Sequence, residues 1–241
     1  MFDHPSQFLD ALENLPVASA EFRDLALKRQ AQLTKPAGAL GRLEDIAIWL
    51  ADWQAREKPV VDRVTALLFA GNHGVVEEGV SPFPASVTAQ MVENFKQGGA
   101  AINALTQQFG HELSVIPLEL ERPTRNMTVD AAMSEDELLD AINIGAAAVN
   151  DCSADVIYFG EMGIGNTTTA AAIAAAVFGG EGASWAGPGT GLEKAGVVHK
   201  ASVINRALAL HRSDISNPFE IMRRLGGREL AAIMGGVVAA R

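Results

Sequence analysis

The segment from Val156 to Thr169 constrains the fold and function of this chain more than any other. It opens with the apolar run Val-Ile-Tyr-Phe, continues as Gly-Glu-Met-Gly-Ile-Gly-Asn and ends in three threonines before an alanine-rich stretch. Because glycine has no Cβ, the backbone N–H groups near Gly163 and Gly165 can approach a ligand closely. The positive end of the following helix favours an anion there. We therefore predict a strand, a phosphate-binding loop and a helix, with Glu161 at the strand end, where open α/β sheets bind their ligands.

The composition narrows the class of protein. The chain has 241 residues, of which 48% are hydrophobic and 20% charged, which suits one large domain or one and a half. Its formal net charge of −10 argues against a general nucleic-acid binder. The single cysteine, Cys152, excludes an intrachain disulfide and a cysteine-cluster metal site.

The apolar segments predict no membrane partner. No segment reaches the ~20 apolar residues needed to span a bilayer, and residues 1–15 lack the basic start and apolar core of a secretion signal. We expect a cytoplasmic protein.

The order of predicted elements indicates an α/β fold. Residues 5–57 are predicted to be helical with a break at 35–38, and strands are predicted at 64–70, 113–120 and 156–159. Ser134 and Glu137 form a capping-box pattern that begins a helix running toward Asn150. Further helices are predicted at 85–98, before Gly110, after Gly165, around 197–208, after Asn217 and at 229–241. Strands alternating with helices predict a mostly parallel sheet covered on both faces, with the helical N-terminal region as an accessory layer.

The glycine pattern alone is a weak signal. There is no P-loop, and Thr168 stands where a dinucleotide-binding fingerprint needs its third glycine. The glycines can therefore serve only to turn the chain. A second glycine loop, Gly187 to Gly191, favours a ligand site, because two such loops at one sheet can enclose a ligand. Lys200 follows that loop by about three helical turns and can supply a point charge to a phosphate.

Several side chains have two interpretations that the sequence leaves open. Glu161 either caps the following turn or acts as a general base with a pKa raised by desolvation. His73 either moves a proton or bonds a neighbouring backbone group. Met91 and Met162 either fill the core or contact a flat apolar ring, which suits polarizable side chains.

Six segments, in this order, resemble the nicotinate-nucleotide:dimethylbenzimidazole phosphoribosyltransferase family. They are Lys35 to Glu44, Asn72 to Val75, Ser81 to Met91, Glu161 to Thr168, Gly187 to Gly191 and Gly226-Gly227. The resemblance covers nearly the whole chain, and the segments that begin at Lys35 and Glu161 are the most specific.

The resemblance implies an enzyme of cobalamin assembly. Such an enzyme moves phosphoribose from nicotinate mononucleotide to 5,6-dimethylbenzimidazole and releases nicotinate and α-ribazole 5′-phosphate. The resemblance further implies a homodimer with a Rossmann-like large domain, a small helical domain, and neither metal nor cofactor at the site. We accordingly expect a helical small-domain segment at 1–58 and an α/β domain at 59–241.

The resemblance also implies roles for individual residues. It places Glu161 beside the reacting nitrogen, where a carboxylate would remove the imidazole N–H proton while the other nitrogen attacks C1 of the ribose from the face opposite nicotinate. The implied benzimidazole pocket comprises Phe83, Met91 and Met162. The implied ribose-phosphate site comprises Gly163, Gly165, Asn166, Thr167, Gly189, Thr190, Gly191 and Lys200.

The chain departs from the family pattern in two places. Family members extend beyond the position of Arg241, and that part carries a Gly-Glu-Gly-Thr/Ser-Gly segment whose glutamate is regarded as the principal base. We expect either a fragment of a longer enzyme or a short paralogue with Glu161 as the remaining candidate base, and in both cases impaired activity of the isolated chain. Asn72 stands where the family commonly has an aspartate.

Two other functions stay open at this point. A short chain of this kind can bind a nucleotide or azole base without catalysis, as a sensor or carrier. The strand-Gly-x-Gly-helix pattern is also found in nicotinamide-dependent oxidoreductases, although the third glycine is displaced.

Overall fold

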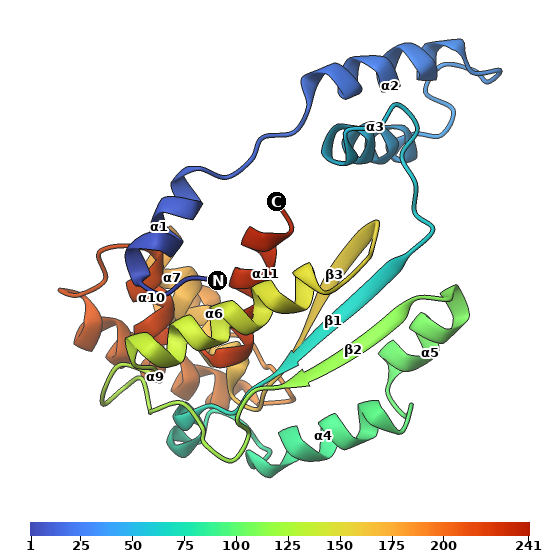
Figure 1. Cartoon of the computed structure of the whole chain (residues 1–241). Helices are drawn as coiled ribbons and strands as arrows, with labels where there is room; N and C mark the ends of the chain where they lie inside the picture. The colour runs from blue at the N-terminus through green and yellow to red at the C-terminus, as the bar shows by residue number, and fades with distance from the viewer.

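The computed structural model describes all 241 residues, from Met1 to Arg241. Figure 1 shows three strands flanked by helices, with the chain coloured from blue to red. The strands are β1 (Val64–Ala70), β2 (Glu112–Pro117) and β3 (Val156–Met162). The helices are α1 (Pro5–Glu13), α2 (Ala20–Gln32), α3 (Arg42–Gln54), α4 (Ser86–Lys96), α5 (Ala101–Phe109), α6 (Glu135–Asn150), α7 (Asn166–Phe178), α8 (Gly182–Trp185), α9 (Lys194–His211), α10 (Pro218–Leu225) and α11 (Arg228–Ala239), with the 3-10 helix η1 at Gly74–Glu78.

The three strands form one parallel sheet in the order β2-β1-β3. Every residue of the central strand β1 is buried, which accounts for its apolar sequence, interrupted only by Thr65. Ala70 at the end of β1 pairs with Pro117 on one side and Met162 on the other. The segments that follow the three strands therefore leave the sheet at one edge, and the predicted α/β fold with a parallel sheet is confirmed.

Helices α6 and α11 cover one face of the sheet and pack tightly against each other. A Cβ at Gly145 of α6 would overlap the carbonyl oxygen of Ala232, and one at Gly235 would overlap that of Ile142. Glycine at both positions thus lets the two backbones touch. Under them, Phe69 and Leu67 of β1 join Ala232 in a hydrophobic cluster.

The other helices pack beside β2 and beyond the carboxyl edge of the sheet. Helices α4 and α5 lie along β2, and α7, α9 and α10 gather where the strands end (Figure 1). A second hydrophobic cluster joins Ala172 of α7, Val203 and Ile204 of α9, and Val75 of η1. Helices α7 and α9 and the 3-10 helix η1 therefore pack together beyond the carboxyl edge of the sheet.

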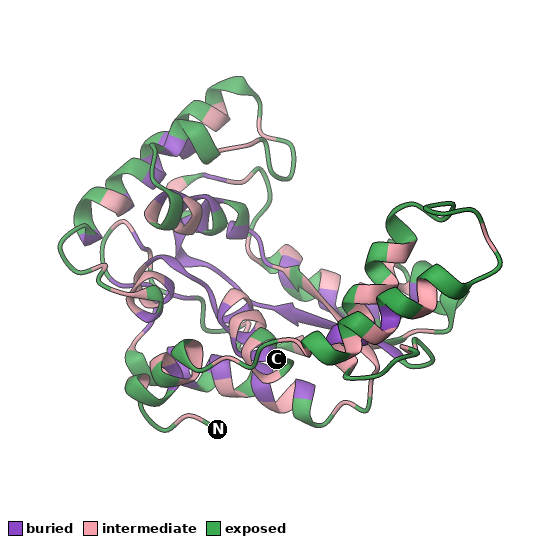
Figure 2. Ribbon diagram, turned by 90° about the horizontal axis from the view of Figure 1, so that it is seen from above, coloured by how far each residue is buried: buried purple, intermediate pink, exposed green.

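The N-terminal helices lie in two different places. Helices α2 and α3 form a hairpin that stands away from the rest of the chain and is largely exposed (Figures 1 and 2). Helix α1, by contrast, buries Phe8 completely against Leu138 and Phe219. The division into 1–58 and 59–241 stays a prediction, and α1 packs on the second of these segments.

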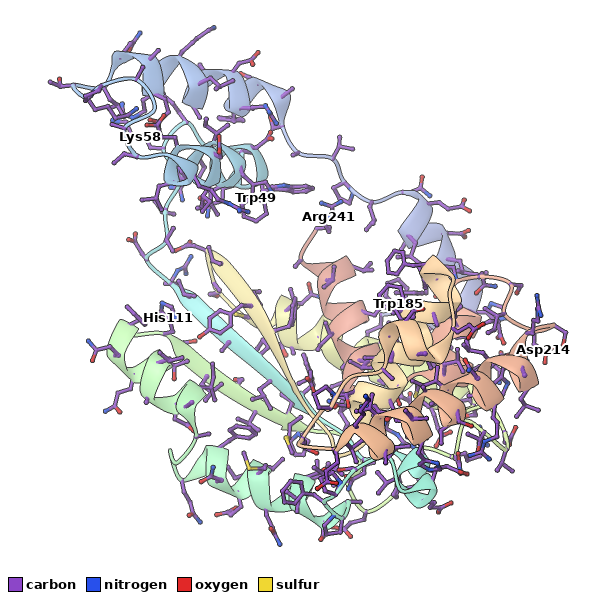
Figure 3. All side chains as sticks on the ribbon, turned by 180° about the vertical axis from the view of Figure 1, so that it is seen from behind. Trp49, Lys58, His111, Trp185, Asp214 and Arg241 are labelled. Atoms are coloured by element: carbon purple, nitrogen blue, oxygen red, sulfur yellow. The ribbon has the colours of Figure 1, made fainter.

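A cavity lies between the hairpin and the sheet. It measures about 540 Å³ and is lined mostly by apolar residues of α3, β3 and the end of α11. Trp49 and Arg241 both border it, and Figure 3 shows them on its two sides. The Arg241 guanidinium lies 4.2 Å from the ring centroid of Trp53. This cavity lies at the amino end of β3, away from the glycine loop at its carboxyl end.

The structure differs from the predicted elements in a few places. The strand predicted at 113–120 ends at Pro117, because the chain turns at Glu119, which has a positive φ of 44°. Residues 14–19 separate α1 from α2, and the short helices η1 and α8 had no sequence signal. No helix has both the length and the apolar character that crossing a membrane requires.

Candidate active site

The loop after β3 needs glycine at both predicted positions. A Cβ at Gly163 would lie 2.5 Å from the carbonyl oxygen of Gly71, so the two loops touch through their backbones. Gly165 has a φ of +94°, which L side chains rarely adopt, and a Cβ there would lie 2.8 Å from Val76. Between them, the Ile164 N–H donates to Thr88 Oγ1 of α4 at 3.1 Å. The segment that follows β1 and helix α4 therefore hold this loop, which leads directly into α7.

Glu161 stands next to the last residue of β3. Its side chain keeps access to solvent, and its Oε2 accepts a hydrogen bond from Asn166 Nδ2 at the start of α7. Burial within the loop raises the pKa of Glu161, and the nearby Glu229 carboxylate raises this pKa further. The bond from Asn166 and the charge of His73 oppose the rise. A carboxylate with a raised pKa at the open edge of a sheet is suited to accept a proton.

Lys200 of α9 is a buried cation with no acidic partner. Its residue exposure is 1%, and its Nζ donates to Thr167 Oγ1 at 2.6 Å and to the Gly187 carbonyl at 3.3 Å. It takes part in no ion pair with the protein, and burial lowers its pKa. A buried ammonium group is costly unless it is neutralised or meets an anion. The site therefore favours a bound anion beside Thr167.

The second glycine loop lies against these two side chains. A Cβ at Gly189 would lie 2.9 Å from Thr167 Oγ1 and 3.3 Å from Lys200 Nζ. Gly189 and Gly191 have positive φ angles of 54° and 117°. Thr190 Oγ1 lies 3.3 Å from Ser81 Oγ, which links this loop to the segment before α4. The start of α7, the loop 187–191 and Lys200 therefore meet. The prediction that both glycine loops follow strands of the sheet was wrong for the second loop, which connects α8 to α9.

The residues predicted to contact the base surround the same edge. Phe83 follows Ser81, is 46% exposed and donates its N–H to Ser81 Oγ at 3.2 Å. Met91 lies on α4, three residues after Thr88, and Met162 is the last residue of β3. Both methionines are half-buried rather than part of the core. Their role in binding a ring stays a prediction.

His73 and Glu229 form a buried pair behind the glycine loop. His73 Nε2 and Glu229 Oε1 are 2.7 Å apart, and the residues are 2% and 0% exposed. The partner of His73 is thus a carboxylate from α11 and not a neighbouring backbone group. The sequence pointed to a helix start near Glu229 but carried no signal that this residue would reach His73, because 156 residues separate them.

No three side chains of His, Cys, Asp or Glu gather where they could hold a metal ion.

The turn after β1 is tied to the segment after β2. Asn72, which stands where an aspartate was expected, donates its Nδ2 to the Leu120 carbonyl at 2.9 Å and so ties the segment after β1 to the one after β2.

A family model described as phosphoribosyltransferase matches residues 15–241. The chain belongs to this phosphoribosyltransferase family. The match includes both glycine loops, Lys200 and Glu161. The family resemblance predicted from the six sequence segments is confirmed.

Similar proteins agree with this assignment. The chain is 55% identical to the nicotinate-nucleotide–dimethylbenzimidazole phosphoribosyltransferase of Novosphingobium aromaticivorans, over 97% of this chain and 69% of that protein. It is 52% identical to the enzyme of the same name from Ruegeria pomeroyi, over 98% of this chain and 69% of that protein. The crystal structure of CobT from Thermus thermophilus superposes with a TM-score of 0.85 at 38% identity, over 91% of this chain and 71% of that chain.

Proposed function

We propose that this phosphoribosyltransferase transfers phosphoribose from nicotinate mononucleotide to 5,6-dimethylbenzimidazole, giving nicotinate and α-ribazole 5′-phosphate. The names of its relatives supply the two substrates. The observation that carries the proposal is the buried Lys200 cation, which has no acidic partner and lies between two glycine loops. A nucleotide phosphate supplies the anion that this arrangement favours.

The phosphate end of the nucleotide is proposed to lie beside Lys200. Its Nζ and the Thr167 hydroxyl would donate to phosphate oxygens, and the positive end of α7 would add to the attraction. Gly163, Gly165, Asn166 and the Gly189–Gly191 loop with Thr190 would surround the ribose and phosphate. Glycines that allow close backbone approach support this position.

Glu161 is proposed as the general base. One nitrogen of dimethylbenzimidazole attacks C1 of the ribose from the face opposite nicotinate, which gives the α product. Glu161 takes the proton from the other nitrogen, and the bond between C1 and nicotinate breaks. The raised pKa of Glu161 supports this role, because it brings the affinity of the carboxylate for a proton closer to the working pH. Phe83, Met91 and Met162 would line the apolar slot for the base.

We also infer a cytoplasmic homodimer. Exposed apolar side chains recur at three-residue steps on α3, at Leu43, Ile46 and Trp49, and form a stripe on one side of a helix that has few contacts with the body. Exposed apolar surface of this kind is typical of an interface. No cofactor is required for the proposed reaction.

A single-turnover assay tests the proposed reaction. With protein in excess over nicotinate mononucleotide and with dimethylbenzimidazole present, we expect nicotinate and α-ribazole 5′-phosphate to appear in equal amounts. A chain that binds both compounds but releases no nicotinate at high protein concentration would instead be a nucleotide- or azole-binding protein. Omitting dimethylbenzimidazole gives the control, because nicotinate release must then stop if transfer rather than hydrolysis is measured.

A further inference from the structure

Glu229 is an unusual residue to find at the centre of this molecule. It is fully buried, with Oε1 at 2.7 Å from His73 Nε2, while its second oxygen, Oε2, has no hydrogen-bond partner. A buried carboxylate oxygen without a partner is costly and calls for an explanation. On the other side of the ring, His73 Nδ1 lies 3.3 Å from Thr169 Oγ1 of α7.

Three glycines leave room for this pair. A Cβ at Gly71 would lie 2.6 Å from Glu229 Oε2, and one at Gly227 would lie 2.8 Å from the same oxygen and would overlap His73 Cε1. A Cβ at Gly163 would lie 2.9 Å from His73 Nε2. Gly71 follows β1 and Gly163 follows β3, so the imidazole and the carboxylate lie directly behind the loops that leave the carboxyl edge of the sheet. The pair cannot move without moving these loops.

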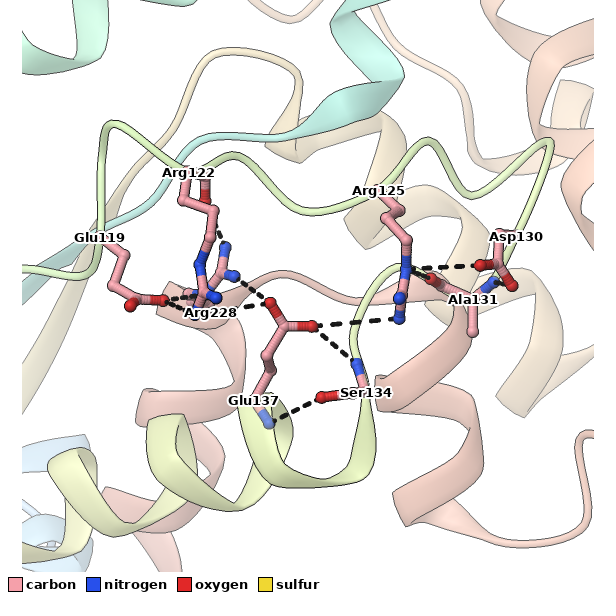
Figure 4. Close-up of polar contacts among 8 residues, drawn as sticks. All are labelled: Glu119, Arg122, Arg125, Asp130, Ala131, Ser134, Glu137 and Arg228. Carbon is pink, nitrogen blue, oxygen red and sulfur yellow. Dashed lines mark hydrogen bonds and ion pairs between the residues drawn. The ribbon is translucent and has the colours of Figure 1, made fainter.

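The start of α11 is fixed by its own ion pairs. Arg228, the neighbour of Glu229, donates to the Arg122 carbonyl at 2.7 Å and to Glu137 Oε1 at 2.6 Å, and its Nε lies 3.2 Å from Glu119 Oε2 (Figure 4). These contacts turn the arginine away from Glu229, so its cation does not neutralise that carboxylate. Glu229 itself lies in the first turn of α11, a position that favours acidic side chains.

The pair also bears on the proton affinity of Glu161. Burial is the main cause of its raised pKa; among the charged groups, Glu229 raises this pKa and His73 opposes the rise. From α7 the facing group is the neutral amide of Asn166, and Thr88 of α4 bonds the loop backbone. Lys200 of α9 bonds Thr167 and has no part in the pKa shift of Glu161.

We propose that His73 and Glu229 form a positioning pair that acts on the transfer reaction through Glu161, by holding the glycine loop that follows Glu161 from behind and placing a buried carboxylate against that loop. The proposal rests on the proposed role of Glu161 as the base. Both residues of the pair are buried behind the loop and expose almost no surface to a substrate. The negative charge of Glu229 makes Glu161 hold a proton more readily, and His73 orients that charge from behind Gly163.

The test is a titration of the free protein without substrate. The carboxyl carbon of Glu161 is followed by 13C NMR over a range of pH, assigned with Glu161→Gln, in the wild type and in Glu229→Gln. Removing the negative charge of Glu229 should move the midpoint of Glu161 to lower pH. Glu229→Asp keeps the charge and should restore the midpoint toward the wild-type value. An unchanged midpoint in Glu229→Gln would overturn the proposal.

The matched control is Glu220→Gln, because Glu220 of α10 is a half-buried carboxylate paired with Arg223 and Arg224 and does not contribute to the pKa shift of Glu161. It should leave the Glu161 midpoint in place. A midpoint that moves equally in both variants would mean that net charge alone acts, and would also overturn the proposal.

A second measurement avoids any variant in the core. Electrostatic coupling is reciprocal, so Glu161→Gln, which changes a solvent-accessible side chain, should alter the pH dependence of the 15N resonances of the His73 ring. An unaltered His73 titration would contradict the proposal even if Glu229→Gln does not fold.

Measurements of enzyme activity separate two hypotheses: that the His73–Glu229 pair is coupled to Glu161, and that Glu161 is the general base. If the titrations change as expected and Glu161 is the base, the acid side of the pH profile of kcat/KM should move to lower pH in Glu229→Gln, with KM for nicotinate mononucleotide little changed. Coupled titrations with an unmoved pH profile would show that the pair is coupled to Glu161, but would reject Glu161 as the base and, with it, any action of the pair on transfer.

Discussion

At the scale of single residues, the site contains two charged side chains, Lys200 and Glu161, that form no ion pair and have different proposed roles. Lys200 is buried without an acidic partner, which prepares a place for an anion. Glu161 is open to solvent, but its surroundings raise its pKa. The sequence predicted both positions from the glycine loops beside them. It did not reveal Glu229, because nothing in the local pattern distinguishes a buried acid from the many exposed ones at helix starts.

Glu161→Gln should lower turnover with little effect on base affinity. The amide keeps the shape of the side chain but cannot accept the imidazole proton, and a general base is typically worth ~10²–10⁴-fold in rate. Product formation at saturating substrates gives the rate, and calorimetry gives the affinity for dimethylbenzimidazole. If turnover stayed within about twofold of wild type, Glu161 would have no part in proton transfer.

Met162→Ala should relax the preference among benzimidazoles. Shortening a side chain beside the ring removes contacts that distinguish the two methyl groups, and single methyl or methylene differences in an apolar pocket are worth roughly 1–3 kcal/mol. The readout is the ratio of kcat/KM for 5,6-dimethylbenzimidazole and benzimidazole. Leu105→Ala, which shortens an exposed apolar side chain on α5, serves as the control. An unaltered ratio would place the slot elsewhere.

At the scale of elements, the sequence predicted what local chemistry determines. The strand at 64–70, the capping box at Ser134 and the Asn217 cap appear as predicted, because the signal for each, an apolar run or a cap, lies in neighbouring residues. The end of β2 and the helix η1 were not predicted. These depend on distant contacts, such as the bonds from Thr124 to Asn72 and from Asn126 to Glu78.

Glu78 illustrates such a distant contact. Its carboxylate accepts bonds from Arg206 of α9 and from Asn126 and Thr128, which lower its pKa to about 2. Because the folded pKa lies below the unfolded value, this stabilisation is present above about pH 4.5 and is lost as the pH falls toward 2.

Glu78→Gln should therefore lower the free energy of unfolding at pH 7 by about 1–2 kcal/mol, a modest value because Arg206 is half exposed. Urea unfolding at pH 7 and at pH 3 measures the difference between variant and wild type. The difference should shrink at pH 3. Glu77→Gln, an exposed neighbour, is the control, and a difference independent of pH would contradict the account.

At the scale of the whole molecule, the parallel sheet and its helices bring the loops after the strands, the loop 187–191 and α9 together at one edge, while the α2–α3 hairpin stands apart (Figure 1). The sequence predicted a helical N-terminal region as an accessory layer. The apolar side chains of α3 in this region are largely exposed, because the hairpin has few contacts with the body. The sequence carried no signal of what covers this stripe.

A second copy of the chain is the proposed cover, and sedimentation velocity at micromolar concentration should find a dimer. The double variant Leu43→Glu with Trp49→Glu places charges on the stripe and should give a monomer with unchanged helix content. Val129→Glu changes an exposed apolar residue outside the hairpin and should leave the dimer intact. A monomeric wild type, or a double variant that remains dimeric, would contradict the proposed interface.

The central claim is that Lys200 and the two glycine loops hold the phosphate of a nucleotide. It is tested most directly by calorimetric titration of nicotinate mononucleotide into the wild type, Lys200→Met and the exposed control Lys194→Met. Methionine keeps the length of the side chain without its charge. Loss of a charged hydrogen bond worth about 1.5–3 kcal/mol should weaken binding roughly tenfold to a hundredfold in Lys200→Met only. Equal affinity in all three proteins would contradict the account.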